Sequence, residues 1–549
     1  MVNHKALLKN DRASKSVRNK HNGFDMRLMA ALVTIAVLLV LLLFPDHPES
    51  FTLQNFSKLP LEWPVIIIAL LIVRGSLQTA LRWVFVLVLA LAVLLRSADI
   101  GSRIAFDRRF SPLVEWHLLG DGWNLASQQV GRLEAGLFIG ALVLVLIVLA
   151  VALYKGLGAI GALSGKRRIA LGSLAGAALA VGTVILLIQG DEKKHQIVQA
   201  NFLSEFIDRG KGMQRSIIDQ QEFVAELAID PLDPLNPPTF AALNNRDVVF
   251  IFVESYGQSF LFDEILGKSA LGRLADMELQ IKNAGLHVKS GWMTSSVRGG
   301  RSWLAHASFA SGLEITSQAR FDRLVSSERV SLYSLFSKAG WKSVGILPAI
   351  KEAWPEGVWY GFDETHDYQR LNYKGEPFGW VTMPDQYTLS AFENNIRHSS
   401  DKPVMAEIAL ISSHAPWTPI PTLVSWDMVD DGSVFNGSHR FGEPMTWGNR
   451  SKVREMYAKS LDYSLATIGE YLARHGNDAL FVIQGDHQPA SIIAGWGKTA
   501  DVPFHIVSDD PDILARFPDD IVTPGMVPNA ESESIAMWSM RKLMATVFE

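Results

Sequence analysis

The chain has 549 residues, and 48% of them are hydrophobic, which is a high share for a soluble protein of this size. Its formal net charge of −5 gives no sign of the basic surface that nucleic acids require, so no nucleic-acid partner is expected. The absence of cysteine excludes disulfides, thiolate metal sites and a cysteine nucleophile.

Residues 1–27 form a basic tail that precedes the first long apolar run. Lysine and arginine concentrate on the cytoplasmic side of membrane proteins, so we expect this tail in the cytoplasm. The first apolar run is not followed by a small-residue cleavage site, which predicts a membrane anchor and not a removed signal peptide.

Residues 28–190 are expected to form a transmembrane domain of five helices. Three apolar runs are close to the length that crosses a bilayer, namely Met29–Phe44, Leu137–Leu153 and Ile169–Ile188. Two shorter runs, Trp63–Val73 and Trp83–Leu95, predict a tight hairpin with arginines at its turn. An odd number of spans places everything after residue 190 outside the cytoplasm, and the loop over residues 97–133 should face the same side.

Residues 191–246 predict a linker. Phe202–Phe206 and Ile217–Leu227 have the apolar spacing of amphipathic helix. The stretch DPLDPLNPPTF, residues 230–240, disfavours helix repeatedly, because proline removes a donor and restricts the residue before it. This stretch therefore predicts an extended spacer.

From residue 247 onward, short apolar runs alternate with helical stretches such as Val453–Arg474. The runs are typical of strands covered on both faces, and they are Val248–Val253, Ser343–Leu347, Val404–Ile411, Leu480–Ile483 and Phe504–Val507. The alternation predicts an α/β domain over residues 247–549, with a mostly parallel sheet and helices on both of its faces.

Polar side chains that suit catalysis follow three of these predicted strands. Glu254 follows the first strand, Asp486 and His487 follow another in GDHQP, and His414 follows a third in SSHAPW. Ligands of parallel α/β folds bind beyond the carboxyl ends of the strands. Each residue alone also suits a cap, a turn or a loop, but together they predict one site at one edge of the sheet.

The segment RGGRSWLAHASFASGL, residues 298–313, places Ser302 behind a glycine pair at the start of a small-residue helix. Glycines before a helix let backbone N–H groups approach an anion closely. The Ser302 hydroxyl therefore caps the helix, attacks a substrate, or does both. Arg298 and Arg301 suit phosphate contacts and surface salt bridges about equally.

The motifs VFIFVES, the Ser302 segment, SSHAPW and GDHQP stand in the order found in the alkaline phosphatase superfamily. The chain resembles most the membrane-anchored branch of that superfamily. This branch includes lipoteichoic acid synthase, the phosphoglycerol transferases of periplasmic glucans, and the phosphoethanolamine transferases. The resemblance covers essentially the whole chain and implies a sulfatase-like catalytic domain outside the cytoplasm.

The resemblance implies roles for the site residues. Ser302 stands where the family has its nucleophile, and its distance to Gly312 matches the family's signature helix. The neighbouring hydroxyls of Thr294, Ser295 and Ser296 fit this spacing less well.

The resemblance also implies a single divalent metal ion, Mn²⁺ or Zn²⁺, whose ligands would be Glu254, Ser302, Asp486 and His487. His414 is implied to contact the substrate phosphate or the leaving group. Its ordinary pKa lies near the working pH, so it is placed to assist proton transfer as well.

Departures from the family patterns bear on the substrate. Ser302 is followed by WLAH and not by the proline and arginine of sulfatases, so sulfatase activity is not expected. Trp354 matches a substrate-binding tryptophan of lipoteichoic acid synthase, but Glu356 stands in place of the expected arginine. Phosphoethanolamine transferases generally carry cysteines in this domain, so their absence favours phosphoglycerol.

Three other features have two readings each. The aromatic cluster of Trp354, Trp359 and Tyr360 either packs a loop or lines a head-group pocket. His306 suits a helix face better than a ligand position, and His366 suits either role.

The resemblance implies a multi-pass phosphotransferase of the bacterial inner membrane, with its catalytic domain on the periplasmic side. Such an enzyme would move a phospholipid head group to a glycan or lipid acceptor through a phosphoseryl intermediate, with phosphatidylglycerol as the favoured donor. A phosphoethanolamine transferase or a phosphodiesterase with the same machinery is the first alternative. A membrane sensor or assembly protein without turnover is the second, and the presence of all four implied ligands argues against it.

Overall fold

We describe a computed structural model of the chain. It describes residues 26–549 except 113–114, 116–119, 121–122, 124–126, 128–130, 190–195, 233–235, 379–380 and 438–448. Of the basic tail expected over residues 1–27, residues 1–25 thus lie outside the described residues. The chain forms two compact units, of which the second contains Ile104–Asp107 and Ile217–Glu549 and the first contains the rest.

The first unit is helical. Among the described residues, three helices are long and apolar enough to cross a membrane, namely α4 (Gly75–Phe106), α6 (Arg132–Gly161) and α7 (Gly165–Ile188). Two shorter apolar helices, Met26–Leu42 and α3 (Glu62–Ile72), lie at the first two predicted spans. Among the described residues, three of the five predicted spans thus coincide with helices long enough to cross a membrane, and the other two coincide with shorter helices. The prediction of five membrane-spanning helices is therefore not confirmed.

Charged residues explain why α4 is longer than its apolar run. Arg96 donates to Glu205 at 2.9 Å, and Arg209 bonds to Asp99. Glu205 and Arg209 lie on α8 (Asn201–Leu227), a single helix where the sequence predicted two amphipathic stretches. Because these pairs satisfy buried charges, residues 97–106 continue the helix where a loop was expected.

The second unit is built around a mixed sheet with strand order β10-β4-β9-β8-β3-β7-β5-β6 and with β11 beside β4. The strands are β3 (Asp247–Val253), β4 (His287–Thr294), β5 (Lys342–Leu347), β6 (Glu364–Asp367), β7 (Val404–Leu410), β8 (Ala479–Gly485), β9 (Asp501–Ser508), β10 (Thr523–Pro524) and β11 (Ile535–Ala536). All five strands predicted from apolar runs are present.

The directions of the strands correct one expectation. The strands β6, β5, β7, β3 and β8 are parallel to one another, but β9 is antiparallel to both β8 and β4, and β10 is antiparallel to β4. The sheet is thus parallel in one half and mixed in the other. Apolar runs report burial on both faces and carry no information on strand direction, which is why a mostly parallel sheet is not confirmed.

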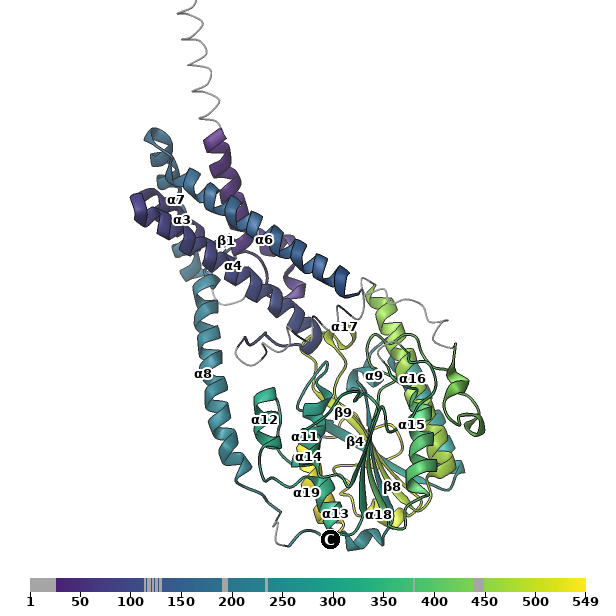
Figure 1. Cartoon of the computed structure of the whole chain (residues 1–549). Coiled ribbons are helices and arrows are strands. Elements are labelled where there is room, and N and C mark those ends of the chain that lie inside the picture. The colour runs from purple at the N-terminus through teal and green to yellow at the C-terminus, as the bar shows by residue number, and fades with distance from the viewer. Residues whose placement is uncertain are drawn as a thin grey trace, which may run out of the picture. The chain divides into compact units, whose positions relative to one another are not determined.

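Helices cover both faces of this sheet (Figure 1). One face carries α10 (Gly267–Asn283), α15 (Asp385–Phe392) and α16 (Arg450–His475), and the other carries α11 (Ser302–Ser311), α12 (Gln318–Val325), α13 (Leu332–Lys338) and α19 (Met540–Val547). Alternate side chains of β3 enter the two cores: Val249 and Ile251 enter one, and Phe250 and Phe252 the other. This double burial explains the continuous apolar run of β3.

The central position of β3 determines where the site forms. β3 lies between β7 and β8, and Val253 is in register with Leu410 on one side and Gly485 on the other. The three strands are parallel, so the residues that follow them emerge at the same edge of the sheet.

Candidate active site

The ends of β3 and β8 bring Glu254, Asp486 and His487 together, and all three residues are buried. Asp486 is oriented by backbone N–H groups, because its Oδ1 accepts from Ser255 at 2.7 Å and from His487 at 2.6 Å. The Ser255 hydroxyl donates to Oε1 of Glu254 at 2.7 Å. The two carboxylates are therefore held by the turns that follow β3 and β8.

Helix α11 adds the fourth group. It begins at Ser302, after Gly299, Gly300 and Arg301, which have φ angles of 73°, 149° and 66°. Glycine tolerates such angles, so the pair makes the sharp entry into the helix. The Ser302 hydroxyl donates to Oε2 of Glu254 at 3.1 Å and lies 3.2 Å from Nε2 of His487. The hydroxyl thus faces the strand ends, and no side-chain cap is formed at this helix start.

The four groups have the spacing of ligands that share one ion. Nε2 of His487 lies 3.5 Å from Oε1 of Glu254 and 3.6 Å from Oδ2 of Asp486. Donor atoms that each lie about 2.1 Å from one metal ion in a tetrahedral site are about 3.4 Å apart, so these separations fit. Two carboxylates, an imidazole and a hydroxyl suit Mn²⁺ or Zn²⁺, and the donor set does not choose between them.

The electrostatics of the carboxylates agree with a cation between them. Burial raises the pKa of the Glu254 carboxyl, but His414, His487 and hydrogen bonds from Ser255 and Ser302 outweigh burial and lower this pKa to about 2. Burial, followed by the charge of Glu254, raises the pKa of Asp486 to about 6. Two buried carboxyl groups that oppose each other's ionisation are stabilised by a shared divalent ion.

The tautomer of His487 suits metal binding. Its Nδ1 lies 2.9 Å from the carbonyl oxygen of Gln488 and therefore donates a proton to it. In the neutral ring Nε2 is then the nitrogen without a proton, and it faces Ser302 and the carboxylates. A backbone carbonyl that fixes the tautomer in this way is typical of metal-binding histidines.

His414 lies beside this cluster. Its backbone N–H donates to the carbonyl of Ile411 at 3.1 Å, and its Nδ1 lies 2.6 Å from the carbonyl oxygen of Ala415. Ser413, the residue before it, donates to the carbonyl of Glu254 at 2.7 Å, so the loop that carries His414 lies against the end of β3. The structure therefore places His414 on a loop beside the four residues expected to bind metal.

The two arginines before α11 have partners of their own. Nη1 of Arg298 donates to Oδ2 of Asp107 at 3.2 Å and also to the carbonyl of Lys498. The guanidinium of Arg301 lies over the ring of Phe106 at 5.3 Å, and burial lowers its pKa to about 10. The described contacts of both side chains go to these partners and not to the Ser302 hydroxyl.

The aromatic cluster is packed. Trp354 lies against Tyr360 with ring centroids 5.1 Å apart, and the indole N–H of Trp359 donates to the carbonyl of Arg329 at 3.0 Å. The Tyr360 hydroxyl reaches the carbonyl of Trp303 on α11 at 3.5 Å. Trp359 and Tyr360 are buried, whereas Trp354 keeps partial exposure.

His306 and His366, which the sequence analysis also considered, pair with glutamates outside the cluster. Nδ1 of His306 on α11 bonds to Glu407 on β7, and its ring stacks on Phe252. Nε2 of His366 lies 3.1 Å from Oε2 of Glu364. Neither histidine joins Glu254, Asp486 and His487 in the ligand group.

Sequence reasoning missed residues that hold the site in place. The Ser413 hydroxyl donates to the carbonyl of Glu254 at 2.7 Å, and its place directly before His414 in SSHAPW is a signal that could have found it. Asp385 bonds to the backbone of the same loop from a distant part of the chain. Its local sequence, MPDQY, shows only an acidic residue at a helix start.

No family model matches the sequence, and no curated protein matches it. Among solved structures, the lipooligosaccharide phosphoethanolamine transferase A of Neisseria meningitidis is similar over 93% of this chain and 95% of that one, with a TM-score of 0.45 and 14% identity. The lipoteichoic acid synthase LtaP of Listeria monocytogenes is similar over 52% and 70%, with a TM-score of 0.36 and 15% identity.

The phosphoglycerol transferase GacH of Streptococcus pyogenes, solved with sn-glycerol-1-phosphate, is similar over 52% of this chain and 72% of that one, with a TM-score of 0.34 and 14% identity. The three proteins carry the names of a phosphoethanolamine transferase, a lipoteichoic acid synthase and a phosphoglycerol transferase.

Proposed function

We propose that this chain is a metal-dependent phosphotransferase that moves a phospholipid head group to a glycan or lipid acceptor. The observation that supports this proposal most directly is the position of the Ser302 hydroxyl at the start of α11. Its oxygen lies 3.1 Å from Oε2 of Glu254 and 3.2 Å from Nε2 of His487. Phosphoglycerol is the favoured head group. The first alternative is a phosphoethanolamine transferase or a phosphodiesterase with the same residues.

Ser302 is the nucleophile in this proposal. A serine hydroxyl is a weak nucleophile at neutral pH, so it needs activation. When bound by Glu254, Asp486 and His487, Mn²⁺ or Zn²⁺ would lower the pKa of the Ser302 hydroxyl and offset charge on the substrate phosphate. The hydrogen bond to Glu254 keeps the Ser302 side chain directed at the strand ends.

Two displacements complete the cycle. In the first, the Ser302 hydroxyl, which has released its proton to solvent, bonds as the alkoxide to phosphorus while the bond from phosphorus to the diacylglycerol oxygen breaks, and protonated His414 gives the leaving oxygen its proton. In the second, an acceptor hydroxyl gives its proton to His414 and bonds to phosphorus while the bond to Ser302 breaks. Backbone N–H groups in the first turn of α11 are oriented to stabilise the phosphate oxygens in both steps.

The substrate determines where the protein must work. A phospholipid donor is held in a bilayer, so a site that uses it belongs on a membrane-anchored chain. Three helices of crossing length among the described residues and five expected spans are both odd counts, and an odd count supports a location of residues after 190 opposite the N-terminal tail. We therefore place the catalytic unit on the periplasmic side of a bacterial inner membrane.

The choice of head group rests on the sequence. The chain lacks the cysteines that phosphoethanolamine transferases generally carry, and Trp354 matches the tryptophan of the phosphoglycerol branch. Glu356 replaces that branch's arginine, so the contacts to the glycerol would differ.

The test uses the purified full chain with vesicles that contain labelled phosphatidylglycerol, phosphatidylethanolamine, or both. We expect diacylglycerol to appear from phosphatidylglycerol when Mn²⁺ or Zn²⁺ is supplied, and not with the Ser302→Ala variant. Release from phosphatidylethanolamine alone would select the alternative head group, and transfer to water alone would indicate a phosphodiesterase. A metal-loaded protein that releases no diacylglycerol from either lipid would contradict the proposal.

A further inference from the structure

Asp385 is a fully buried carboxylate at the start of α15 that bonds to the loop after β7. Its Oδ1 accepts from the backbone N–H groups of Ile411 and Ser412, both at 2.9 Å. In return, the backbone N–H of Asp385 donates to the Ser412 hydroxyl at 3.0 Å. Three hydrogen bonds thus join one residue to two consecutive positions of the loop.

The other oxygen of Asp385 is satisfied from the helix packed beside it. The Ser464 hydroxyl on α16 donates to Oδ2 at 2.7 Å. A buried carboxylate is costly unless its oxygens accept hydrogen bonds, so this arrangement must form as a whole. Asp385 therefore anchors the loop to α15 and α16 on one face of the sheet.

The anchored loop continues directly into the candidate site. The residue after Ser412 is Ser413, which donates to the carbonyl of Glu254 at 2.7 Å. The next residue, His414, donates its backbone N–H to Ile411 at 3.1 Å. Residues 411–414 are thus held at one end by Asp385 and at the other by the backbone of an implied metal ligand.

We propose that Asp385 is a positioning residue for the proton-transfer step. It fixes the backbone at Ile411 and Ser412, and this fixes where the loop places the His414 imidazole relative to Glu254. The inference rests on the proposed function, because it requires that His414 exchanges a proton with the substrate oxygens.

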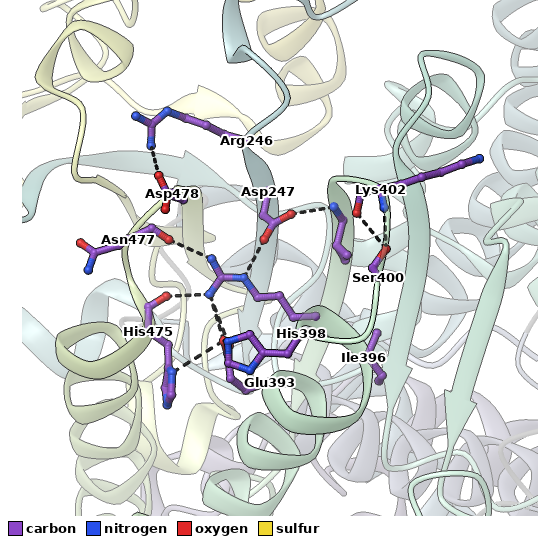
Figure 2. Close-up of polar contacts among 12 residues, drawn as sticks. Arg246, Asp247, Glu393, Ile396, His398, Ser400, Lys402, His475, Asn477 and Asp478 are labelled. Carbon is purple, nitrogen blue, oxygen red and sulfur yellow. Dashed lines mark hydrogen bonds and ion pairs between the residues drawn. The ribbon is translucent and has the colours of Figure 1, made fainter.

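The opposite end of the same strand offers a matched control. Oδ1 of Asp247 accepts from the N–H of Val404, the first residue of β7, at 2.7 Å. Oδ2 of Asp247 accepts from Nε of Arg397 at 2.7 Å, and Arg397 also reaches Glu393 and the carbonyl of His475 (Figure 2). Asp247 thus forms the same type of carboxylate-to-backbone bond to β7, but at the edge of the sheet away from Ser302.

The experiment compares Asp385→Ala, Asp385→Asn and Asp247→Asn in the full chain, with phosphatidylglycerol vesicles as substrate. We expect Asp385→Ala to lower kcat about 100-fold, because a small displacement of a catalytic group has an effect of that size. The KM for the lipid and the bound metal should change little. Asp385→Asn keeps one accepting oxygen and an N–H₂ that can donate to Ser464, so it should recover part of kcat.

Hydrogen exchange gives a readout that does not depend on turnover. The amides of Ile411 and Ser412 should exchange faster in both Asp385 variants, and those of β8 should not. Asp247→Asn should lower the thermal unfolding midpoint and leave kcat unchanged. If Asp385→Ala does not fold, the measurements of kcat and hydrogen exchange on Asp385→Asn test the positioning role.

Two results would overturn the inference. One is an Asp385 variant that loses stability like Asp247→Asn but keeps its kcat. The other is a fall in kcat without faster exchange at Ile411 and Ser412. A wild-type chain without transferase activity would instead contradict the proposed function. In that case, unchanged hydrogen exchange at Ile411 and Ser412 in the Asp385 variants would still contradict the anchoring of the loop.

Discussion

The Ser302 hydroxyl donates a hydrogen bond to Glu254, although 48 residues separate the two in the chain. Glu254 stands at the end of the central strand β3, and Ser302 begins a helix on one face of the same sheet. The contact therefore depends on the packing of α11 against β3, which Phe250 and Phe309 provide with ring centroids 5.2 Å apart. A nucleophile placed in this way is sensitive to changes in either element.

Removal of the hydroxyl should abolish turnover while the fold persists. We expect Ser302→Ala to lower diacylglycerol release by about 1,000-fold or more, because no other group on α11 replaces the attacking oxygen. Ser302→Thr keeps a hydroxyl and should retain measurable activity. Ser296→Ala, which removes a neighbouring hydroxyl that bonds to Ser308, is the control and should remain active. Equal activity of Ser302→Ala and wild type would contradict the nucleophile assignment.

Metal removal should affect both activity and stability. Dialysis against a chelator should stop head-group release and lower the thermal unfolding midpoint, because it leaves Glu254 and Asp486 buried without a shared cation. Addition of Mn²⁺ or Zn²⁺ should restore both properties. Glu254→Gln should weaken the metal-induced rise in the midpoint. A midpoint that does not respond to metal, together with full activity in chelator, would speak against the metal centre.

Gly485 should not tolerate a side chain. A Cβ at this position would lie 1.9 Å from the carbonyl oxygen of Tyr256, and Asp486 is the next residue. We expect Gly485→Ala to cost about 1–3 kcal/mol of unfolding free energy and to reduce activity, since the backbone must shift. Gly272→Ala on α10 is the control: apart from its chain neighbours and the backbone of its own helix, no described atom lies within 4 Å of a Cβ at this position, and alanine favours helix. Similar stabilities of the two variants would refute the close approach.

His505 should make stability depend on pH. It is fully buried, with Nδ1 2.7 Å from the Ser290 hydroxyl and Nε2 3.1 Å from the Tyr256 hydroxyl, and burial lowers its pKa to about 3. The pKa of histidine in the unfolded chain is about 6.5. Below that pH the residue is therefore protonated in the unfolded chain, whereas it stays neutral in the folded chain. Stability is therefore lost as pH falls from about 6.5 towards 3, by up to about 1.4 kcal/mol per pH unit.

The variant His505→Gln isolates this contribution. Its unfolding free energy should fall less steeply with decreasing pH than that of wild type, because glutamine does not titrate. The difference between the two slopes should correspond to about one proton taken up on unfolding. Thermal unfolding in detergent at a series of pH values between 4 and 7 measures the two slopes. Parallel curves for the two proteins would show that His505 does not titrate on unfolding.

Much of the catalytic unit follows from local patterns. The run VVFIFV is buried on both faces in the structure, and the residues after it, after Leu410 and after Gly485 meet at one edge because the three strands are adjacent and parallel. The helix that starts at Ser302 and ends before Gly312, whose φ is 72°, is also visible in the sequence. These features depend on short segments and on the rule that parallel strands share an edge.

Other features depend on partners far along the chain. The antiparallel direction of β9 has no sequence signal, because a buried strand looks the same in either direction. Residues 97–106 are helical where a loop was expected, since Asp99 pairs with Arg209 on another helix. The role of Asp385 depends on the folded position of Ile411 and Ser412, so its own segment gives no hint of it.

The central claim is that Ser302 carries the head-group phosphate during turnover. Cleavage after Arg301 and Arg320 releases a peptide of residues 302–320, whose mass is readable after acid quench of a reaction with phosphatidylglycerol vesicles. We predict a peptide heavier by about 154 Da for phosphoglycerol, against about 123 Da for phosphoethanolamine, with the group on Ser302. Diacylglycerol that accumulates while this peptide stays unmodified, or an adduct on another residue, would contradict the account.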